Sequence, residues 1–237
     1  KNTVPDYFPV EKEYGYSVFS TVFYAEFLGK KLNVIDCPGA DDFVGSAITA
    51  LNVTDTGVIV IDSQYGVEVG TQNIFRTAEN LNKPILFAMN QLDGEKADYD
   101  NVINQMHETF GNRIVQVNAM IDVLLMKMYS WSPEGGTPTI SEIPESEMEK
   151  ARELNQKLVE AAAENDETLM EKFFEQGSLT EDEMREGIRK GLITRSIYPV
   201  FCVSALRDMG VRRMMEFLGN VVPLVSEMPK PENTAGE

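Results

Sequence analysis

The chain has 237 residues, which suits one large domain or one domain with a sizeable insertion. Its 38 acidic and 21 basic residues give a formal net charge of −17, and such a charge repels phosphate backbones, so direct DNA binding is excluded. No apolar run approaches the roughly 18–20 residues that span a bilayer, so no membrane partner is expected. The two cysteines, Cys37 and Cys202, make no disulfide framework, which predicts a reducing, cytoplasmic setting.

Apolar stretches alternate with helical patterns along the first half of the chain. Strands are predicted at residues 17–27, 32–35, 57–61, 84–89 and 113–117, and helices at residues 43–53, 69–80 and 98–110. The strands at 57–61 and 84–89 are short continuous apolar runs, a pattern typical of strands buried on both faces. Strands that alternate with helices of ten or more residues indicate a parallel sheet.

This alternation stops after Val117. Residues 120–131 are apolar and fit either a strand or a helix, whereas residues 132–139 are rich in Pro and Gly and predict a loop. A long acidic helical region follows at residues 144–190, and a strand at 197–203 and a helix at 210–218 then resume the earlier pattern.

Two helix starts are predicted inside the acidic region. Ser146 is expected to cap a first helix, and Thr180 a later one, where Glu183 completes a capping box. The predicted fold class is therefore α/β, an open and mostly parallel sheet with flanking helices and a mostly helical acidic insertion. Its predicted divisions are a core at residues 1–117 and 192–223, an insertion at 118–191, and a linker or tail at 224–237.

Ligands bind outside the carboxyl ends of strands in an open parallel sheet, and three loops at such ends carry suggestive residues. The first, DCPGADDF, spans residues 36–43. Asp36 can orient a magnesium-bound water, and Gly39 lets a backbone amide approach a phosphate. Considered alone, the loop fits a tight turn with an Asp cap equally well.

The second loop, NQLD, spans residues 90–93. The Asp93 carboxylate can accept hydrogen bonds from N1–H and the 2-amino group of guanine, a donor pair that adenine lacks. Asn90 would tie neighbouring loops together. Considered alone, NxxD is more often an Asx-rich turn.

The third loop begins Ser204-Ala205-Leu206, and a backbone amide there can donate to the 6-oxo group of guanine. The tripeptide means little in isolation. The order Asp-x-Pro-Gly, Asn-x-x-Asp, Ser-Ala after three apolar strands is, however, the order found in guanine-nucleotide-binding GTPases.

The chain resembles elongation factor G over nearly its whole length. DCPGADDF is similar to DTPGHVDF of that family, NQLD to NKMD, SAL to SAF, and EKEYGYSVFS to the first switch sequence EKERGITITS. The stretches IDVLLMKMYSW and ENDETLMEKFFEQGSLTEDEMREGIRK resemble parts of the family's insertion, the most specific part of the match. Tetracycline ribosomal protection proteins and release factor 3 share the loops, but this acidic helical segment is not expected in them.

The resemblance implies a P-loop GTPase-type fold, with GTP or GDP and Mg²⁺ as cofactors. Asp36 is expected to hold magnesium through water, Ser17 to take the place of the switch threonine that binds the metal, and Gly39 to contact the γ-phosphate. The expected guanine-binding residues are Asn90, Gln91, Asp93, Ser204, Ala205 and Leu206. The implied function is translation elongation on the ribosome, with translocation as its step.

The chain departs from this family at four places. No GxxxxGK[ST] loop occurs in it; such a loop is expected upstream in a longer parent, and this fragment is expected to be inactive because that loop supplies most of the phosphate binding. Ala40 replaces the histidine that orients the attacking water, so slow hydrolysis is expected. Gln91 replaces a lysine, which predicts weaker affinity with unchanged specificity. Val117 runs directly into Asn118, where the family has a further loop.

The implied partner is the ribosome, with the stalk protein docking on the acidic insertion, and the chain is expected to be a monomer. The alternatives are a nucleotide-free or non-hydrolysing ribosome-binding module, and a ribosomal protection or release factor 3-like GTPase. The single histidine, His107, is interpreted as a surface residue, and Arg207, Arg212 and Arg213 as a solvated helix face.

Overall fold

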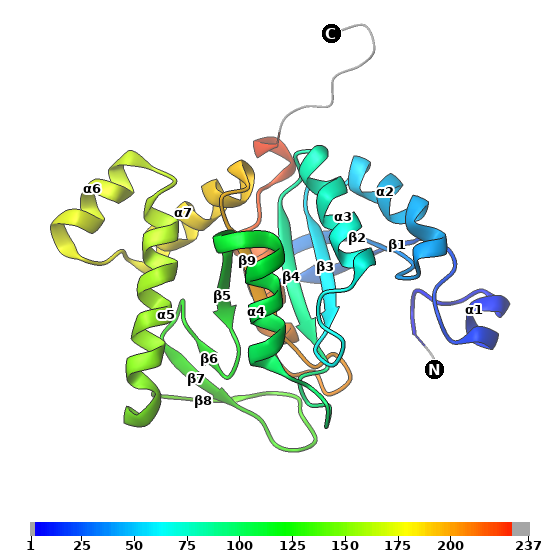
Figure 1. The fold of residues 1–237 in the computed structure, drawn as a ribbon, viewed down its shortest axis with the longest axis horizontal. Helices are drawn as coiled ribbons and strands as arrows, with labels where there is room; N and C mark the ends of the chain where they lie inside the picture. The colour runs from blue at the N-terminus through cyan, green and yellow to red at the C-terminus, as the bar shows by residue number, and fades with distance from the viewer. Residues whose placement is uncertain (1–2, 229–237) are drawn as a thin grey trace, which may run out of the picture.

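The computed structural model describes residues 3–228, and the predicted linker lies largely outside them. In this part of the chain a seven-stranded sheet has the order β3-β4-β9-β5-β6-β7-β8 (Figure 1). The parallel strands are β3 (Gly57–Asp62), β4 (Ile85–Asn90), β9 (Tyr198–Cys202) and β5 (Ile114–Asn118). The antiparallel strands β6 (Ile121–Asp122), β7 (Lys127–Ser130) and β8 (Thr139–Ser141) extend it beyond β5. The predicted α/β fold with an open sheet is confirmed.

Helices flank the sheet and cover both faces of its central strands. They are α2 (Val44–Val53), α3 (Val69–Asn80), α4 (Tyr99–Phe110), α5 (Glu145–Ala163), α6 (Glu167–Gln176), α7 (Glu181–Thr194) and α8 (Val211–Asn220). On β4, Phe87 and Met89 pack in one apolar cluster with residues of α3 and α4. The alternate residues Leu86 and Ala88 pack in another cluster with residues of α5, α7 and α8. Because successive side chains of a strand point to opposite faces, β4 is buried on both, as its sequence predicts.

The strand β3 differs from its prediction. Ile59 and Ile61 are buried, but Val58 and Val60 are 40% and 61% exposed. In the described residues β3 is an edge strand that pairs only with β4, and its second face has no covering layer. The prediction that it is buried on both faces is therefore wrong.

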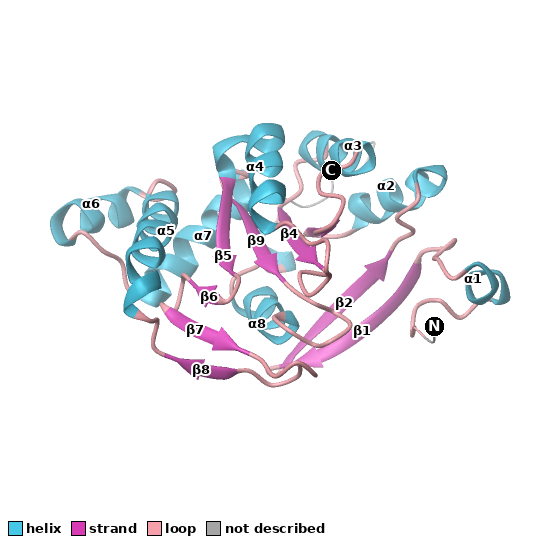
Figure 2. Ribbon diagram, turned by 60° about the horizontal axis from the view of Figure 1, so that its bottom comes forward, coloured by secondary structure: helices cyan, strands magenta, loops and turns pink. Residues whose placement is uncertain are grey.

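The first two strands, β1 (Thr21–Phe27) and β2 (Lys30–Asp36), form an antiparallel hairpin outside the main sheet (Figure 2). The strand predicted from residue 17 begins at Thr21. The amides of Val18 and Phe19 donate to Glu11 Oε1 at 3.0 and 3.1 Å, so they are committed to a side chain. Glu11 lies on the short helix α1 (Pro9–Tyr14) and is buried.

The acidic region forms the three helices α5, α6 and α7. Thr180 caps α7 in a capping box with Glu183, as predicted. The cap predicted at Ser146 is wrong, because α5 starts at Glu145 after Pro144, whose fixed φ suits the residue before a helix. Leu158 and Ile188 share the apolar cluster of the sheet, so α5 and α7 pack directly on it. The division at residues 118 and 191 stays a prediction.

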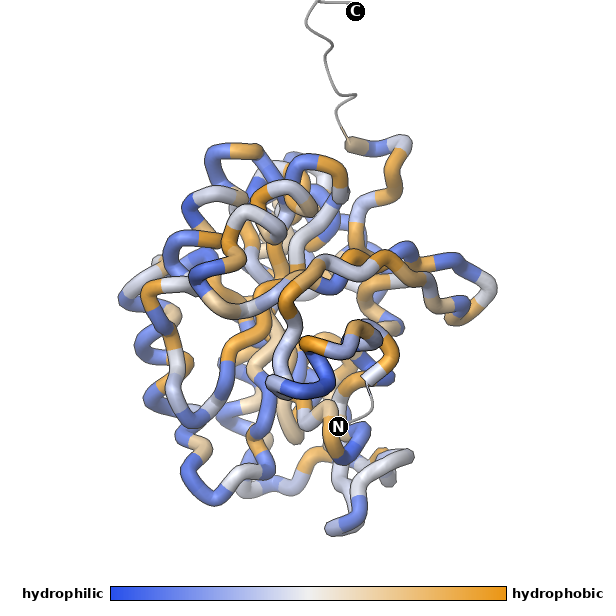
Figure 3. Tube along the Cα trace, turned by 90° about the vertical axis from the view of Figure 1, so that its right-hand side faces the viewer, coloured by the Kyte–Doolittle hydropathy of each residue, from blue (hydrophilic) through white to orange (hydrophobic). Residues whose placement is uncertain are grey.

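Figure 3 shows hydrophobic segments through the centre of the molecule and hydrophilic segments over much of its outside. Some apolar residues still lie at exposed turns, among them Leu28 and Leu206. Within residues 3–228, none of the helices combines the length and apolar character that crossing a membrane requires.

A buried ion pair joins the start of the predicted insertion (residues 118–191) to α8. Arg213 Nε contacts Asp122 Oδ2, and the two residues are 4% and 0% exposed. Asp122 Oδ1 also accepts hydrogen bonds from the amides of Leu124 and Leu125, at 3.0 and 2.9 Å. The interpretation of Arg213 as solvated is therefore wrong, because it faces a carboxylate inside the fold.

Candidate guanine-nucleotide site

Two of the predicted loops meet at the carboxyl ends of neighbouring parallel strands. The strand β4 ends at Asn90, and β9 leads directly into Ser204. Asn90 Oδ1 accepts a hydrogen bond of 3.0 Å from the Ala205 amide. One side chain thus holds the NQLD loop against the Ser-Ala-Leu loop, at the edge of the sheet where ligands of such folds bind.

The Ser-Ala-Leu loop is closed by backbone hydrogen bonds. The Ser204 amide donates to Met209 O at 2.9 Å, and the Met209 amide donates to Ser204 O at 3.0 Å. Leu206 lies at the tip and is 86% exposed. Ser204 is buried, and among the described residues its hydroxyl has no hydrogen-bond partner. A buried polar atom without a partner at a sheet edge is the kind of group that a polar ligand or an ordered water satisfies.

The NQLD loop is a tight turn. Gln91 adopts a φ of 64°, and the Gly94 amide donates to Gln91 O at 2.9 Å. The side chain of Gln91 does not stand free, because its Nε2 donates to Asp62 Oδ2 at 2.7 Å. Asp62 ends β3, so this bond ties a third strand end to the turn. Sequence analysis did not single out Asp62. Asp62 lies opposite Asn90 in the register of the sheet, so a prediction of strand pairing would have placed the two residues together.

Asp93 forms an ion pair with Arg207. The sequence predicts Arg207 on a solvated helix face. Arg207 Nε lies 2.9 Å from Asp93 Oδ2, and the Asp93 side chain is 17% exposed. Arg207 lies in the loop before α8, so its interpretation as a helix residue is wrong. Its neighbour Arg212 on α8 has a 67% exposed side chain, as expected.

The predicted magnesium residues form a second group. Asp36 ends β2, and Gly39 and Ala40 are exposed in the loop that follows. Burial, followed by the nearby carboxylates of Asp6 and Glu11, raises the pKa of Asp36. The Ser17 hydroxyl donates to Asp6 Oδ1 at 2.7 Å. Asp6 therefore neighbours both predicted metal residues.

These oxygens suit magnesium, which takes hard oxygen ligands, keeps several waters and needs only one or two carboxylates. Within residues 3–228, however, no group of three or more His, Cys, Asp or Glu side chains is placed to hold a metal ion. No hydrogen bond or ion pair between described residues joins this group to the NQLD and Ser-Ala-Leu loops. Within residues 3–228 the two groups are separate hydrogen-bonded clusters, and their shared role in binding one nucleotide stays a prediction.

An open α/β sheet with Asn-x-x-Asp and Ser-Ala loops at its carboxyl edge defines a nucleotide-binding domain of the GTPase type. Residues 1–224 match the family model described as the elongation factor Tu GTP binding domain, and the chain belongs to that family. By the description of that family, the chain is a GTP-binding domain.

A solved structure has the same fold. The protein ttk003000868 of Thermus thermophilus matches with a TM-score of 0.85 and 28% sequence identity. The match covers 93% of this chain and 34% of that protein. The chain therefore spans about a third of the length of the relative.

Proposed function

We propose that the NQLD and Ser-Ala-Leu loops bind the guanine base of GTP and GDP. The supporting observation is the hydrogen bond from the Ala205 amide to Asn90 Oδ1, which holds the two loops together. Asp93 would accept from N1–H and the 2-amino group of the base. The 6-oxo group of the base would accept a hydrogen bond from the Leu206 amide, because the Ala205 amide already donates to Asn90. Ser204 would support this loop, and the Gln91 stem would lie beside the base.

We propose that Asp36, Ser17 and Gly39 serve the phosphate end. The position of Asp36 at the end of β2 supports this role, because a carboxylate at a strand end can orient a magnesium-bound water. Asp36 would hold magnesium through water, and Gly39, exposed in its loop, would offer its amide to the γ-phosphate. Bound Mg²⁺ would supply charge neutralisation at the phosphates.

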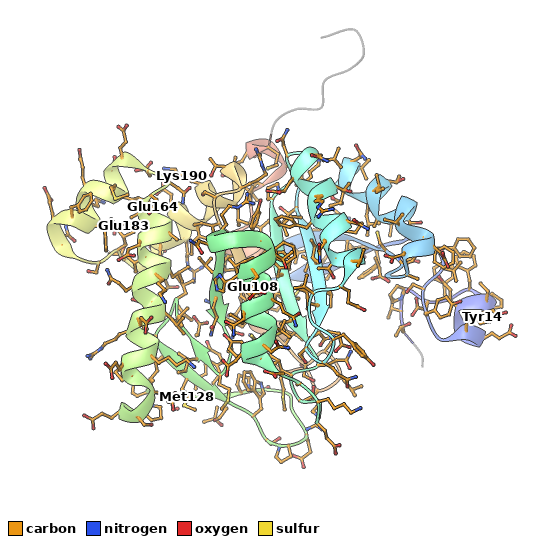
Figure 4. The ribbon with its side chains drawn as sticks, viewed as in Figure 1. Tyr14, Glu108, Met128, Glu164, Glu183 and Lys190 are labelled. Carbon is orange, nitrogen blue, oxygen red and sulfur yellow. The ribbon has the colours of Figure 1, made fainter. Side chains whose placement is uncertain are left out.

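We propose that the domain works in a longer, ribosome-associated GTPase of elongation, with translocation as its step. The acidic helices would dock the ribosomal stalk protein. On α6, Phe174 is 78% exposed between the exposed Glu171 and Glu175, which suits a partner that is both apolar and basic. Figure 4 shows Glu164, Glu183 and Lys190 together on this helical side, far from Tyr14 at the opposite end.

A second candidate is a ribosome-binding module that does not hydrolyse GTP. Ala40 favours it, because a methyl group cannot orient a water molecule.

Replacing Ala40 with histidine should accelerate hydrolysis in the full-length protein. An imidazole at this exposed loop position can orient the attacking water, and positioning of this kind changes rates by at least about tenfold. The measurement is ribosome-stimulated hydrolysis of GTP, with ATP as the control nucleotide. Equal, fast rates for both proteins would refute the idea that Ala40 limits turnover. Hydrolysis of neither nucleotide by the Ala40→His variant would favour the non-hydrolysing module.

A further inference from the structure

Arg207 lies where the predicted guanine-binding turn meets the loop between β7 and β8. Its Nε contacts Asp93 Oδ2 at 2.9 Å, and its Nη1 donates to Pro133 O at 2.9 Å. In Figure 1 the β7–β8 loop runs below the ends of the central strands, on the side where β4 ends. One guanidinium thus bridges the predicted insertion (residues 118–191) and the base-binding edge.

The β7–β8 loop is shaped to meet the backbone of Arg207. The Gly136 amide donates to Arg207 O at 2.8 Å. A Cβ on Gly135 would lie 1.8 Å from the same carbonyl oxygen, a distance that no side chain tolerates. Gly135 also adopts a φ of +84°, which favours glycine. The loop therefore reaches Arg207 only because residue 135 has no side chain.

Asp93 keeps capacity for a ligand while Arg207 holds it. A carboxylate offers about four lone-pair sites, and the ion pair with Arg207 Nε involves only Oδ2. A guanine base needs two more. A carboxylate that is already restrained loses less rotational freedom when the base binds, and such preorganisation strengthens binding.

We infer that Arg207 is a positioning residue for guanine recognition by Asp93, and that the β7–β8 loop holds Arg207 in place. This inference rests on the proposed guanine site. Asp93, Arg207 and the β7–β8 loop would thus connect the bound base to the predicted insertion. An isolated exposed ion pair contributes little, but Arg207 is also held through Pro133 and Gly136.

The test is the dissociation constant of GDP for the 237-residue chain, measured by NMR titration. Arg207→Ala should weaken GDP binding by about threefold to fivefold, the range of one partly exposed ion pair. Arg207→Lys should weaken GDP binding less than Arg207→Ala does, because lysine keeps the positive charge. The matched control is Arg212→Ala, which removes the same charge from an exposed position and should leave affinity unchanged.

The loop is tested separately with two glycine variants. Gly135→Ala should weaken GDP binding as much as Arg207→Ala does, because its Cβ meets the Arg207 carbonyl. Gly177→Ala, at the end of α6, carries similar backbone strain, at a φ of +70°, but its Cβ meets nothing within 4 Å and it does not touch Arg207, so it should bind GDP normally. GDP should also shift the Gly136 amide signal in the unmodified chain and not in Arg207→Ala, an effect that a purely structural role does not produce.

The outcomes separate the two proposals. If the unmodified chain prefers GDP over ADP and Arg207→Ala binds GDP equally well, the guanine site stands and the role of Arg207 is overturned. If the unmodified chain binds GDP and ADP equally well, the proposed base site fails, and the role of Arg207 fails with it. Weaker binding in Arg207→Ala and Gly135→Ala, with normal binding in both controls, supports the inference.

Discussion

Replacing Asp93 with asparagine should reverse the base preference of the site from guanine to xanthine. Guanine presents a 2-amino donor to residue 93, and xanthine presents a 2-oxo acceptor at the same place. The amide nitrogen of the introduced asparagine would donate to the 2-oxo group of xanthine but would oppose the 2-amino group of guanine. Sites built to match a donor or acceptor reject the mismatched ligand strongly, so we expect the ratio of guanine to xanthine affinity to fall on the order of 100-fold.

The substitution preserves most of the turn. Asparagine has nearly the same size and shape as aspartate and can keep an oxygen beside Arg207 Nε, so the loop should keep its place. Asp100→Asn is the matched control, because it makes the same chemical change at an exposed position on α4 and should leave preference unaltered. Titration of both variants with GDP and xanthosine diphosphate gives the ratio. An Asp93→Asn protein that still prefers GDP would show that Asp93 does not face the base.

Replacing Arg213 with alanine should destabilise the fold by about 3–5 kcal/mol, the usual cost of leaving a buried charge without its partner. Asp122 is 0% exposed and would keep only the amides of Leu124 and Leu125 as donors. Urea unfolding followed by circular dichroism measures the change. Arg212→Ala is the control, since its exposed pair with Glu216 should contribute less than about 1 kcal/mol.

A double variant isolates the cause. Asp122→Asn removes the carboxylate charge but keeps an oxygen that can accept from the two amides. Combined with Arg213→Met, it should be more stable than Arg213→Met alone, because no unpaired charge remains. If the double variant is less stable than the single one, the loss comes from packing around α8 and not from the orphaned carboxylate.

The parallel strands and their helices were predictable because their signals are local. Apolar runs such as β4 and β9 are buried on both faces. Thr180 and Glu183 mark the start of a helix within four residues of sequence. The exposure of Val60 was not predictable in this way. Its apolar sequence suits a central strand, but whether a strand lies at an edge depends on which strands pair with it.

The candidate site was predictable as a set of loops but not as a set of contacts. The strand ends place Asn90 and Ala205 together because parallel strands share an edge. The contact between Arg207 and Asp93 depends on the β7–β8 loop of the predicted insertion. No local sequence pattern reveals this dependence. Arg213 makes the same point, since its partner lies 91 positions away.

The orientation of Ser17 was not predictable from its motif. The resemblance expects its hydroxyl to face a metal, and in the structure this hydroxyl donates to Asp6. Asp6 also neighbours Asp36, so the expected metal residues share a neighbour without contacting each other through a hydrogen bond. A local motif states which residue types are present, while their orientation depends on side chains outside the motif.

The central claim is that the NQLD and Ser-Ala-Leu loops form a guanine-specific surface. The most direct measurement is an NMR titration of the 237-residue chain with GDP and, separately, with ADP. Binding is expected to be weak, because these residues contain no GxxxxGK[ST] loop to hold the phosphates. GDP should shift the amide signals of residues 90–94 and 204–206, and ADP should leave them in place. Equal shifts with both nucleotides, or GDP shifts confined to other parts of the chain, would contradict the account.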